Sequence, residues 1–158
     1  RVARQALREV REAVAGYRQP TLRSELDGAR QMLEAAGIAC VIEHTGEALP
    51  PAIEAVLAWT VREGVTNVIR HSRARQCAIR VTSENGKAYA QILNDGYQEP
   101  NLPRTQAGSG LSGLTERIAA QGGQVEAGPL LSAGHPSFRL WVALPVENSV
   151  TSERKSQL

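Results

Sequence analysis

The stretch Arg62-Glu-Gly-Val-Thr-Asn-Val-Ile-Arg-His-Ser72 carries three polar side chains, Glu63, Asn67 and His71, at intervals of four residues. Residues four apart lie on one face of a helix and rotate by only about 40° per step, so all three can face a single pocket. An amide oxygen is a hard ligand for Mg²⁺, a carboxylate can accept a proton, and an imidazole can donate to a phosphate oxygen. The spacing therefore indicates a site for a metal-bound phosphate chain, although a solvated helix face would show the same pattern.

The apolar residues around this stretch predict a long helix. Pro50 and Pro51 open it, because proline is tolerated in the first turn. Its apolar side chains recur at intervals of three or four residues, which predicts a buried stripe on a face other than that of the polar residues. This stripe consists of Ile53, Val56, Leu57, Val61, Val65 and Val68.

The other predicted elements follow from periodicity and turn residues. An amphipathic helix (22–36, with Leu22, Leu26, Ala29, Met32 and Leu33 apolar) ends at Gly37, and a strand follows at 38–44. Alternation on both sides of Asn85-Gly86 predicts a hairpin over 76–93. A helix from Leu111 to Gly122-Gly123 precedes two strands at 124–127 and 137–144. This order predicts an α+β two-layer sandwich, in which helices cover one face of a mixed, largely antiparallel sheet.

Length and composition favour a single globular domain with short extensions. The chain has 158 residues, and 18 Lys and Arg against 16 Asp and Glu leave a net charge of +2. The basic residues are scattered along the sequence, so they do not indicate a nucleic-acid partner. The two cysteines, Cys40 and Cys77, lie in apolar strand-like segments and are expected to be reduced thiols. No apolar run reaches the roughly 18 residues of a membrane helix, so we expect a cytosolic domain.

A glycine-rich segment, Gly108-Ser-Gly-Leu-Ser-Gly113, precedes the helix from Leu111. Glycines allow backbone amides to approach an anion, and a helix start adds partial positive charge. A flexible linker would have the same composition, and Asn94-Asp95-Gly96 at the end of the hairpin is equally typical of a simple turn.

Taken in order, these motifs resemble the Bergerat ATP-binding fold, and more closely the catalytic domain of sensor histidine kinases of the DesK and NarX type. Arg62 to Ser72 is similar to that family's N box, and Gly108 to Arg117 to its glycine-rich lid hinge and the following helix. The resemblance implies that residues 1–18 are the end of the dimerisation and phosphoacceptor helix with its linker. Residues 19–146 would be the ATP-binding domain, and 147–158 a polar tail.

The resemblance also implies roles for the N-box residues. Asn67 would hold Mg²⁺ against the ATP phosphates, and Glu63 would be the catalytic residue that helps polarise the attack on the γ-phosphate. Arg70 or His71 would contact phosphate oxygens. Catalysis would consist mainly of positioning and charge neutralisation.

In the same family, the segment 97–110 corresponds to the ATP lid. Gly108, Gly110 and Leu111 would place their amides over the phosphates. Asn94-Asp95-Gly96 would border the nucleotide base, with Asn94 at the position of the family's adenine-reading aspartate.

Three positions depart from the family pattern. Asn94 supplies a neutral amide in place of a carboxylate, which weakens a hydrogen bond to the adenine amine. Phe138 replaces a threonine beside the adenine, so a hydroxyl is lost and bulk is added. Gln98 replaces the second glycine of the first glycine box, a change that DesK-like members tolerate.

The implied function is the transfer of the ATP γ-phosphate to a histidine, for relay to a response regulator. The three histidines, His44, His71 and His135, all lie outside the first helix, so the acceptor would lie on a dimerisation helix absent from this chain. The implied partners are ATP with Mg²⁺, the upstream dimerisation domain and the response regulator, within a homodimeric parent anchored in the bacterial inner membrane.

Two alternatives remain open from the sequence. A Bergerat-fold serine kinase of a regulatory protein would share the ATP site but lack a dimerisation helix, and the helical pattern of residues 1–15 argues against it. A non-catalytic interaction module with weak ATP binding would be consistent with Asn94 and Phe138.

Overall fold

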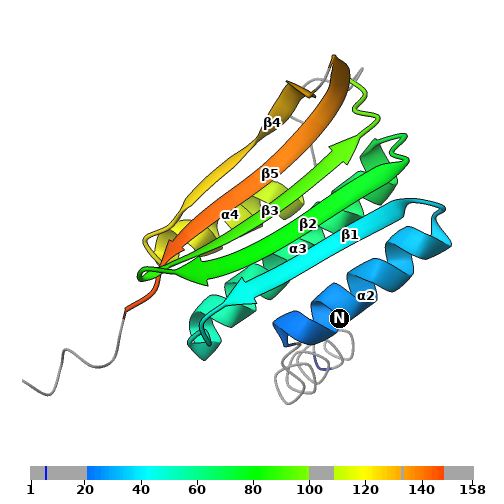
Figure 1. The fold of residues 1–158 in the computed structure, drawn as a ribbon. Coiled ribbons are helices and arrows are strands. Elements are labelled where there is room, and N and C mark those ends of the chain that lie inside the picture. Colours follow the sequence, from blue (N-terminus) through cyan, green and yellow to red (C-terminus); the bar gives the residue numbers. More distant parts are fainter. Residues whose placement is uncertain (1–5, 7–20, 100–108, 133, 148–158) are drawn as a thin grey trace, which may run out of the picture.

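The computed structural model describes residue 6 and residues 21–99, 109–132 and 134–147 (Figure 1). Within these residues, five strands form one sheet in the order β1-β2-β3-β5-β4, and three helices cover one of its faces. The elements are α2 (Leu22–Ala35), β1 (Ala39–Gly46), α3 (Pro51–His71), β2 (Gln76–Glu84), β3 (Lys87–Asp95), α4 (Ser109–Ala120), β4 (Gln124–Ser132) and β5 (His135–Pro145).

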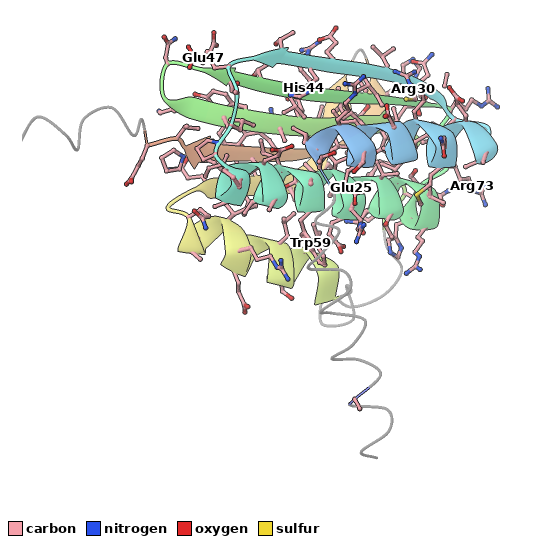
Figure 2. The ribbon with its side chains drawn as sticks, turned by 90° about the horizontal axis from the view of Figure 1, so that it is seen from below. Glu25, Arg30, His44, Glu47, Trp59 and Arg73 are labelled. Carbon is pink, nitrogen blue, oxygen red and sulfur yellow. The ribbon has the colours of Figure 1, made fainter. Side chains whose placement is uncertain are left out.

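The sheet is mixed. β1 pairs with β2 in parallel, and α3 connects these two strands. The pairs β2–β3, β3–β5 and β4–β5 are all antiparallel. In the edge-on view of Figure 2, the described helices lie on one side of the sheet. The predicted α+β two-layer sandwich is confirmed.

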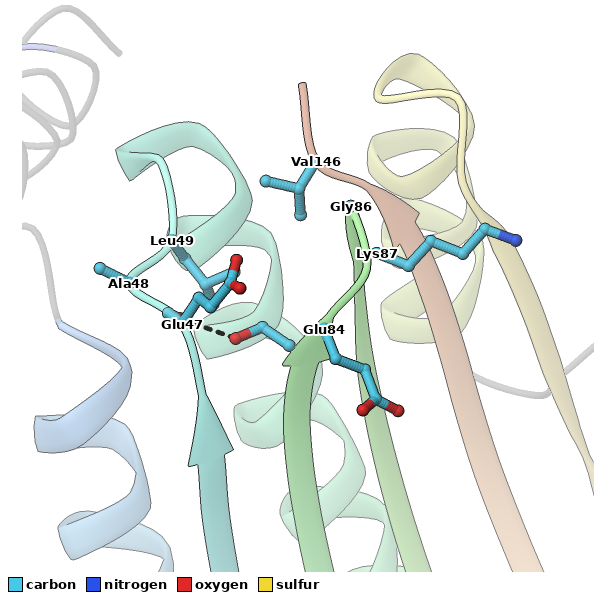
Figure 3. A pocket seen from close by; sticks show the side chains of 8 residues that line it. Glu47, Ala48, Leu49, Glu84, Gly86, Lys87 and Val146 are labelled. Carbon is cyan, nitrogen blue, oxygen red and sulfur yellow. Dashed lines mark hydrogen bonds between the residues drawn. The ribbon is translucent and has the colours of Figure 1, made fainter. Parts of the chain in front are cut away.

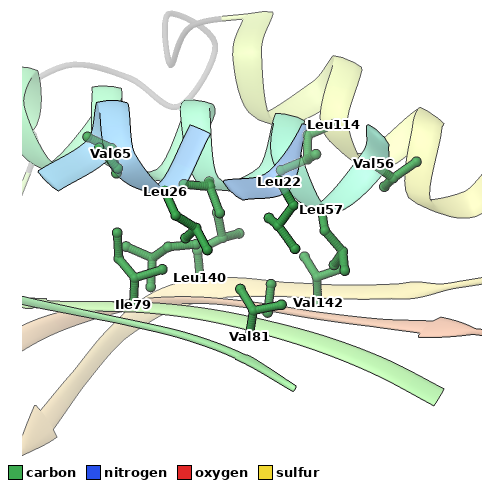
Figure 4. Packing of buried hydrophobic residues seen from close by; sticks show 14 of the residues in the cluster. Leu22, Leu26, Val56, Leu57, Val65, Ile79, Val81, Leu114, Leu140 and Val142 are labelled. Atoms are coloured by element: carbon green, nitrogen blue, oxygen red, sulfur yellow. The ribbon is translucent and has the colours of Figure 1, made fainter. Parts of the chain in front are cut away.

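The core lies between the three helices and the sheet, with α3 contributing the largest share. All six residues of the predicted stripe on α3 are buried, and Leu57 and Val61 have no exposed surface. Figure 4 shows that helix residues such as Leu57 point toward strand residues such as Val81 and Val142. Gly64 lets the helix approach closely, because a Cβ there would be 3.0 Å from the side chain of Ile92.

The predicted hairpin is also confirmed. Asn85 and Gly86 have φ angles of 53° and 73°, as a two-residue turn between right-twisted strands requires. β2 and β3 bury alternate residues, so each presents one side chain set to the helices and the other to the opposite face. The first predicted helix ends as expected at Gly37, whose φ is 75°.

Two details differ from the prediction. Met32 was expected in the apolar stripe of α2, but it is 50% exposed, because the stripe follows Leu22, Leu26, Ala29 and Leu33. The strand expected at 124–127 continues to Ser132 and includes Pro129. Proline is tolerated there because β4 lies at the edge of the sheet.

Some predictions fall outside the described residues. The dimerisation helix of residues 1–18, most of the lid segment and the tail after residue 147 belong to this group. In the part of the chain that the structure describes, no helix is both long and apolar enough to cross a lipid bilayer.

Candidate functional site

The predicted N-box residues lie on the second half of α3. Glu63 and Asn67 are half-buried, and Arg70 and His71 are exposed near the end of the helix. Glu63, Asn67 and His71 follow one another at the four-residue spacing of a single helical face. The buried stripe occupies the face toward the sheet, so this polar column lies on another side of α3.

The side chains of the column are not bound to the rest of the fold. Within residues 21–99, 109–132 and 134–147, no side-chain hydrogen bond or ion pair involves Glu63, Asn67 or His71. By contrast, the hydroxyl of Thr60, one turn earlier, donates to the carbonyl of Val56 at 2.8 Å. Half-buried polar groups without partners cost free energy unless water or a ligand binds them. The column is therefore free to bind a ligand.

The start of α4 lies against this column. Gly110 is in the first turn of α4, and a Cβ at this position would collide with Oε2 of Glu63. The first turn of a helix has free N–H groups and a partial positive charge. Leu111 is half-buried and packs against the core, which fixes the position of the helix start. A carboxylate and a helix N-terminus thus share one region.

A cluster around Trp59 holds α4 against α3 (Figure 2). The guanidinium of Arg117, on α4, lies 4.3 Å from the centroid of the Trp59 ring, and that of Arg62 lies 5.9 Å from it. Arg62 also forms an ion pair with Glu25 on α2. Cation–π contacts contribute on the order of 0.5–2 kcal/mol each. The cluster therefore links the three helices and supports the contact between Gly110 and Glu63.

The end of α3 is fastened to the end of β3. The carboxylate of Asp95 accepts hydrogen bonds from the backbone N–H groups of Arg75 at 2.8 Å and Gln76 at 2.9 Å. The N–H of Arg73 donates to the carbonyl of Gly96 at 3.0 Å. Gly96 has a φ of 66°, and any side chain there would collide with the carbonyl of Arg73. The Asn-Asp-Gly segment therefore fixes the loop that follows the polar column.

Asn94 lies on the opposite face of β3 from Asp95. It alternates with the buried residues Ala88, Ala90 and Ile92, so it faces the helices, and it is only 4% exposed. Its Nδ2 donates to the carbonyl of Asp95 at 2.7 Å. Because a carbonyl oxygen only accepts hydrogen bonds, the amide orientation is fixed and Oδ1 points away from this bond. Asn94 therefore presents an acceptor toward the helical layer.

Two aromatic residues lie beside Asn94. Phe138 is its cross-strand partner on β5, and the ring of Tyr97 stacks on that of Phe138 with a centroid distance of 5.7 Å and an angle of 23°. The role of Tyr97 was not predicted from the sequence. The sequence feature that could have indicated it is an aromatic residue directly after the glycine that follows a strand, in a chain with only 4% aromatic residues.

The described residues offer little for a metal besides Asn67. No group of three or more His, Cys, Asp or Glu side chains in them could hold an ion. Mg²⁺ commonly takes only one or two protein ligands and obtains the rest from phosphates and water. The half-buried, unpartnered oxygen of Asn67 fits that arrangement.

The cysteine thiols do not contribute reactive groups. Cys40 and Cys77 are partners across the parallel β1–β2 pair, and both are free. Burial raises the pKa of Cys77 to about 12, with smaller contributions from Cys40 and Asp95. Burial also raises the pKa of Cys40. Both thiols are therefore neutral at pH 7, which excludes a thiolate nucleophile here.

A small hollow lies at the other end of the sheet, where Glu47, Ser83, Lys87 and Val146 contribute to its lining (Figure 3). The hydroxyl of Ser83 donates to the carbonyl of Glu47 at 2.6 Å, which closes part of it. None of the predicted site residues lines this hollow.

The structure places the predicted site residues in two groups. Glu63, Asn67 and Gly110 lie in one region, and Asn94, Asp95 and Gly96 lie at the end of the sheet to which α3 runs. Gly108 lies outside the described residues.

Comparison with known proteins identifies the relatives of this chain. It is 33% identical over 118 residues to the sensor histidine kinase YvfT of Bacillus subtilis, a match that covers 73% of this chain and 31% of that protein. It is 32% identical over 127 residues to the sensor histidine kinase DesK of the same organism, covering 78% of this chain and 34% of DesK. The chain therefore spans about a third of the length of the curated relatives it matches. No model of a known protein family matches it.

Several solved structures with the same fold are histidine kinase domains. The histidine kinase domain of a blue-light activated kinase from Erythrobacter litoralis superposes with a TM-score of 0.63 at 14% identity, covering 80% of this chain and 65% of that one. The catalytic domain of histidine kinase ThkA gives 0.60 at 18% identity, covering 79% and 89%. At these identities the likeness supports the fold alone. Together with the sequence relatives, it shows that the chain belongs to the family of ATP-binding catalytic domains of DesK/YvfT-type sensor histidine kinases, which have the Bergerat fold.

Proposed function

We propose that this domain binds Mg²⁺-ATP between α3, the start of α4 and the Asn94 end of the sheet, and transfers the γ-phosphate to a histidine. The observation that carries the proposal is the polar column of α3, in which Glu63 and Asn67 are half-buried and no side chain has a partner among the described residues. A helix N-terminus beside the column adds the partial positive charge that phosphates require.

Each residue of the column has a chemical role in this proposal. The amide oxygen of Asn67 binds Mg²⁺, which neutralises phosphate charge when it is present. Glu63 accepts a proton or polarises the attacking group, and Arg70 and His71 donate to phosphate oxygens. The amides of Gly110 and Leu111 bind the phosphates from the side of α4, and a phosphate contact of Gly108 stays a prediction.

Asn94 is the residue that we propose reads the base. Its Oδ1 accepts a hydrogen bond from the exocyclic amine of adenine, because its Nδ2 is already bound to the carbonyl of Asp95. The carboxylate of Asp95 accepts two backbone hydrogen bonds on the other face, so it supports the loop instead of the base. Gly96, which has a positive φ, provides the bend directly after the end of β3.

The acceptor histidine lies on another segment in this proposal. His44, His71 and His135 are all exposed on elements of the described fold, and His71 belongs to the polar column itself. We therefore propose that the upstream dimerisation helix supplies the acceptor and that a response regulator receives the phosphate. Three further points stay predictions: that the parent protein is a membrane-anchored homodimer, that this domain lies in the cytoplasm, and that it has no nucleic-acid partner.

The test is nucleotide binding by an Asn67→Ala variant, measured by calorimetry with and without Mg²⁺. We expect the ATP affinity of the wild type to rise on addition of Mg²⁺. In the presence of Mg²⁺, the variant should bind ATP at least about tenfold more weakly than the wild type, because the protein oxygen ligand is removed. Gln91→Ala is the matched control, since Gln91 is an amide on the face of the sheet away from the helices.

Two results would contradict this function. Unchanged Mg²⁺-dependent binding by Asn67→Ala would refute the metal role. Wild-type affinity weaker than about millimolar in a folded sample would favour the non-catalytic module, for which the neutral Asn94 and the bulky Phe138 are the supporting features.

A further inference from the structure

Backbone contacts of Tyr97 with two neighbouring segments hold the aromatic pair Tyr97–Phe138 in place. The N–H of Tyr97 donates to the carbonyl of Pro136 at 3.3 Å, and Tyr97 also pairs with Ser72 at the end of α3. The Tyr97 hydroxyl makes no hydrogen bond with any described residue. The ring is therefore held by its backbone and by stacking, and its polar tip has no structural role in the described fold.

The position of the pair is informative. Phe138 belongs to the row that crosses the sheet on the side of the helices, with Asn94 and Pro129 as its neighbours. Asn94 is buried, whereas Phe138 and Tyr97 are only partly buried, so part of the surface of these two aromatic residues remains exposed next to an amide that presents an acceptor. Exposed aromatic surface beside a single acceptor matches a planar base that carries an exocyclic amine.

We propose that Tyr97 and Phe138 form the stacking wall of the base subsite, and that they determine the affinity of this domain for nucleotides over free phosphate chains. This inference rests on the proposed function and adds residues that the polar column does not include. Stacking on aromatic side chains compensates for the neutral Asn94, whose hydrogen bond is weaker than that of a carboxylate.

The experiment compares two ligands on the purified chain, Mg²⁺-ATP and inorganic triphosphate with Mg²⁺, by calorimetry. Tyr97→Leu and Phe138→Leu should each weaken ATP binding by about 5- to 150-fold, the usual effect of removing an aromatic ring from a stacked base. Binding of inorganic triphosphate, which has no base, should stay within about twofold of the wild-type value.

Two controls separate stacking from other effects. Tyr97→Phe keeps the ring and should bind ATP like the wild type. Tyr89→Leu removes a ring from the other aromatic pair, Tyr89–Trp141, whose centroids are 6.1 Å apart on the opposite face of the sheet. That variant should also bind ATP normally, and circular dichroism checks that each variant is folded.

The outcomes distinguish this inference from the function on which it rests. Unchanged or tighter ATP binding by both leucine variants, or an equal loss for ATP and triphosphate, would overturn the stacking wall while leaving the ATP site intact. A wild-type chain that binds no ATP would remove the proposed function, and this inference with it.

Discussion

The two sides of α3 differ in how they relate to the rest of the molecule. The apolar side is fully engaged: Leu57, Val61 and Val65 are at most 1% exposed and pack against the sheet. The polar side has Glu63 and Asn67 half-buried and without a partner in the described part of the chain. One helix therefore contributes stability with one face and keeps the other face available for binding.

This difference shows how a functional group can be recognised without a bound ligand. Polar side chains that serve the fold have short bonds inside it, as Thr60 and Asp95 do. Polar side chains that are held half-buried without such bonds are available to a ligand. Part of the free-energy cost of removing them from water has already been incurred on folding. The distinction predicts different consequences for substitutions on the two sides.

The largest expected effect follows from truncating the apolar side. Leu57→Ala should lower the free energy of unfolding by about 2–5 kcal/mol, since it leaves a cavity under a fully buried position. Urea denaturation monitored by circular dichroism measures this loss. Asn67→Ala, on the polar side, should change stability by less than about 0.5 kcal/mol. A loss of several kcal/mol in Asn67→Ala would mean that the polar column supports the fold.

Local pattern predicted most of the fold, because its signals lie within single elements. The stripe of α3 repeats at helical spacing, and Asn85-Gly86 has the positive φ angles of a two-residue turn. Met32 was misplaced because a residue beside the stripe has nearly the same spacing as one within it. The length of β4 was underestimated because its pairing with β5, and not its own composition, extends it through Pro129.

The candidate site was predictable only in part. The four-residue spacing placed Glu63 and Asn67 on one face, because both residues lie on the same helix. The contact of Gly110 with Glu63 and the stacking of Tyr97 on Phe138 join segments far apart in the chain. Such contacts depend on sheet order and packing, for which local periodicity carries no information.

An intermediate effect distinguishes two adjacent residues, Asn94 and Asp95, which lie on opposite faces of β3. Asp95→Ala should lower stability by about 1–2 kcal/mol, since two backbone N–H groups lose their acceptor to solvent. The ratio of ATP to ITP affinity should not change. Denaturation and calorimetry with both nucleotides measure these quantities.

Asn94→Asp should instead change the nucleotide preference. It should also lower stability, because a carboxylate cannot donate to the carbonyl of Asp95 as Nδ2 of Asn94 does at 2.7 Å. A carboxylate accepts more strongly from the 6-amino group of adenine, so ATP should bind about fivefold more tightly, whereas ITP presents an oxygen there and should bind more weakly. An ATP preference that shifts in Asp95→Ala but not in Asn94→Asp would assign the base to Asp95.

The smallest expected effect comes from two glycines of α4 that share a helix but differ in surroundings. Gly113→Ala should stabilise the fold by about 0.5–1 kcal/mol, because alanine is the better helix former and, apart from its chain neighbours and the nearby helix backbone, no atom lies within 4 Å of the new methyl group. Gly110→Ala gains the same propensity, but its methyl group would collide with Glu63 Oε2 and displace it from the column. Thermal unfolding and Mg²⁺-ATP titration should therefore show a more stable, fully binding Gly113→Ala and a binding-impaired Gly110→Ala. Equal nucleotide affinity in the two variants would mean that the position of the Glu63 carboxylate against α4 does not matter for binding.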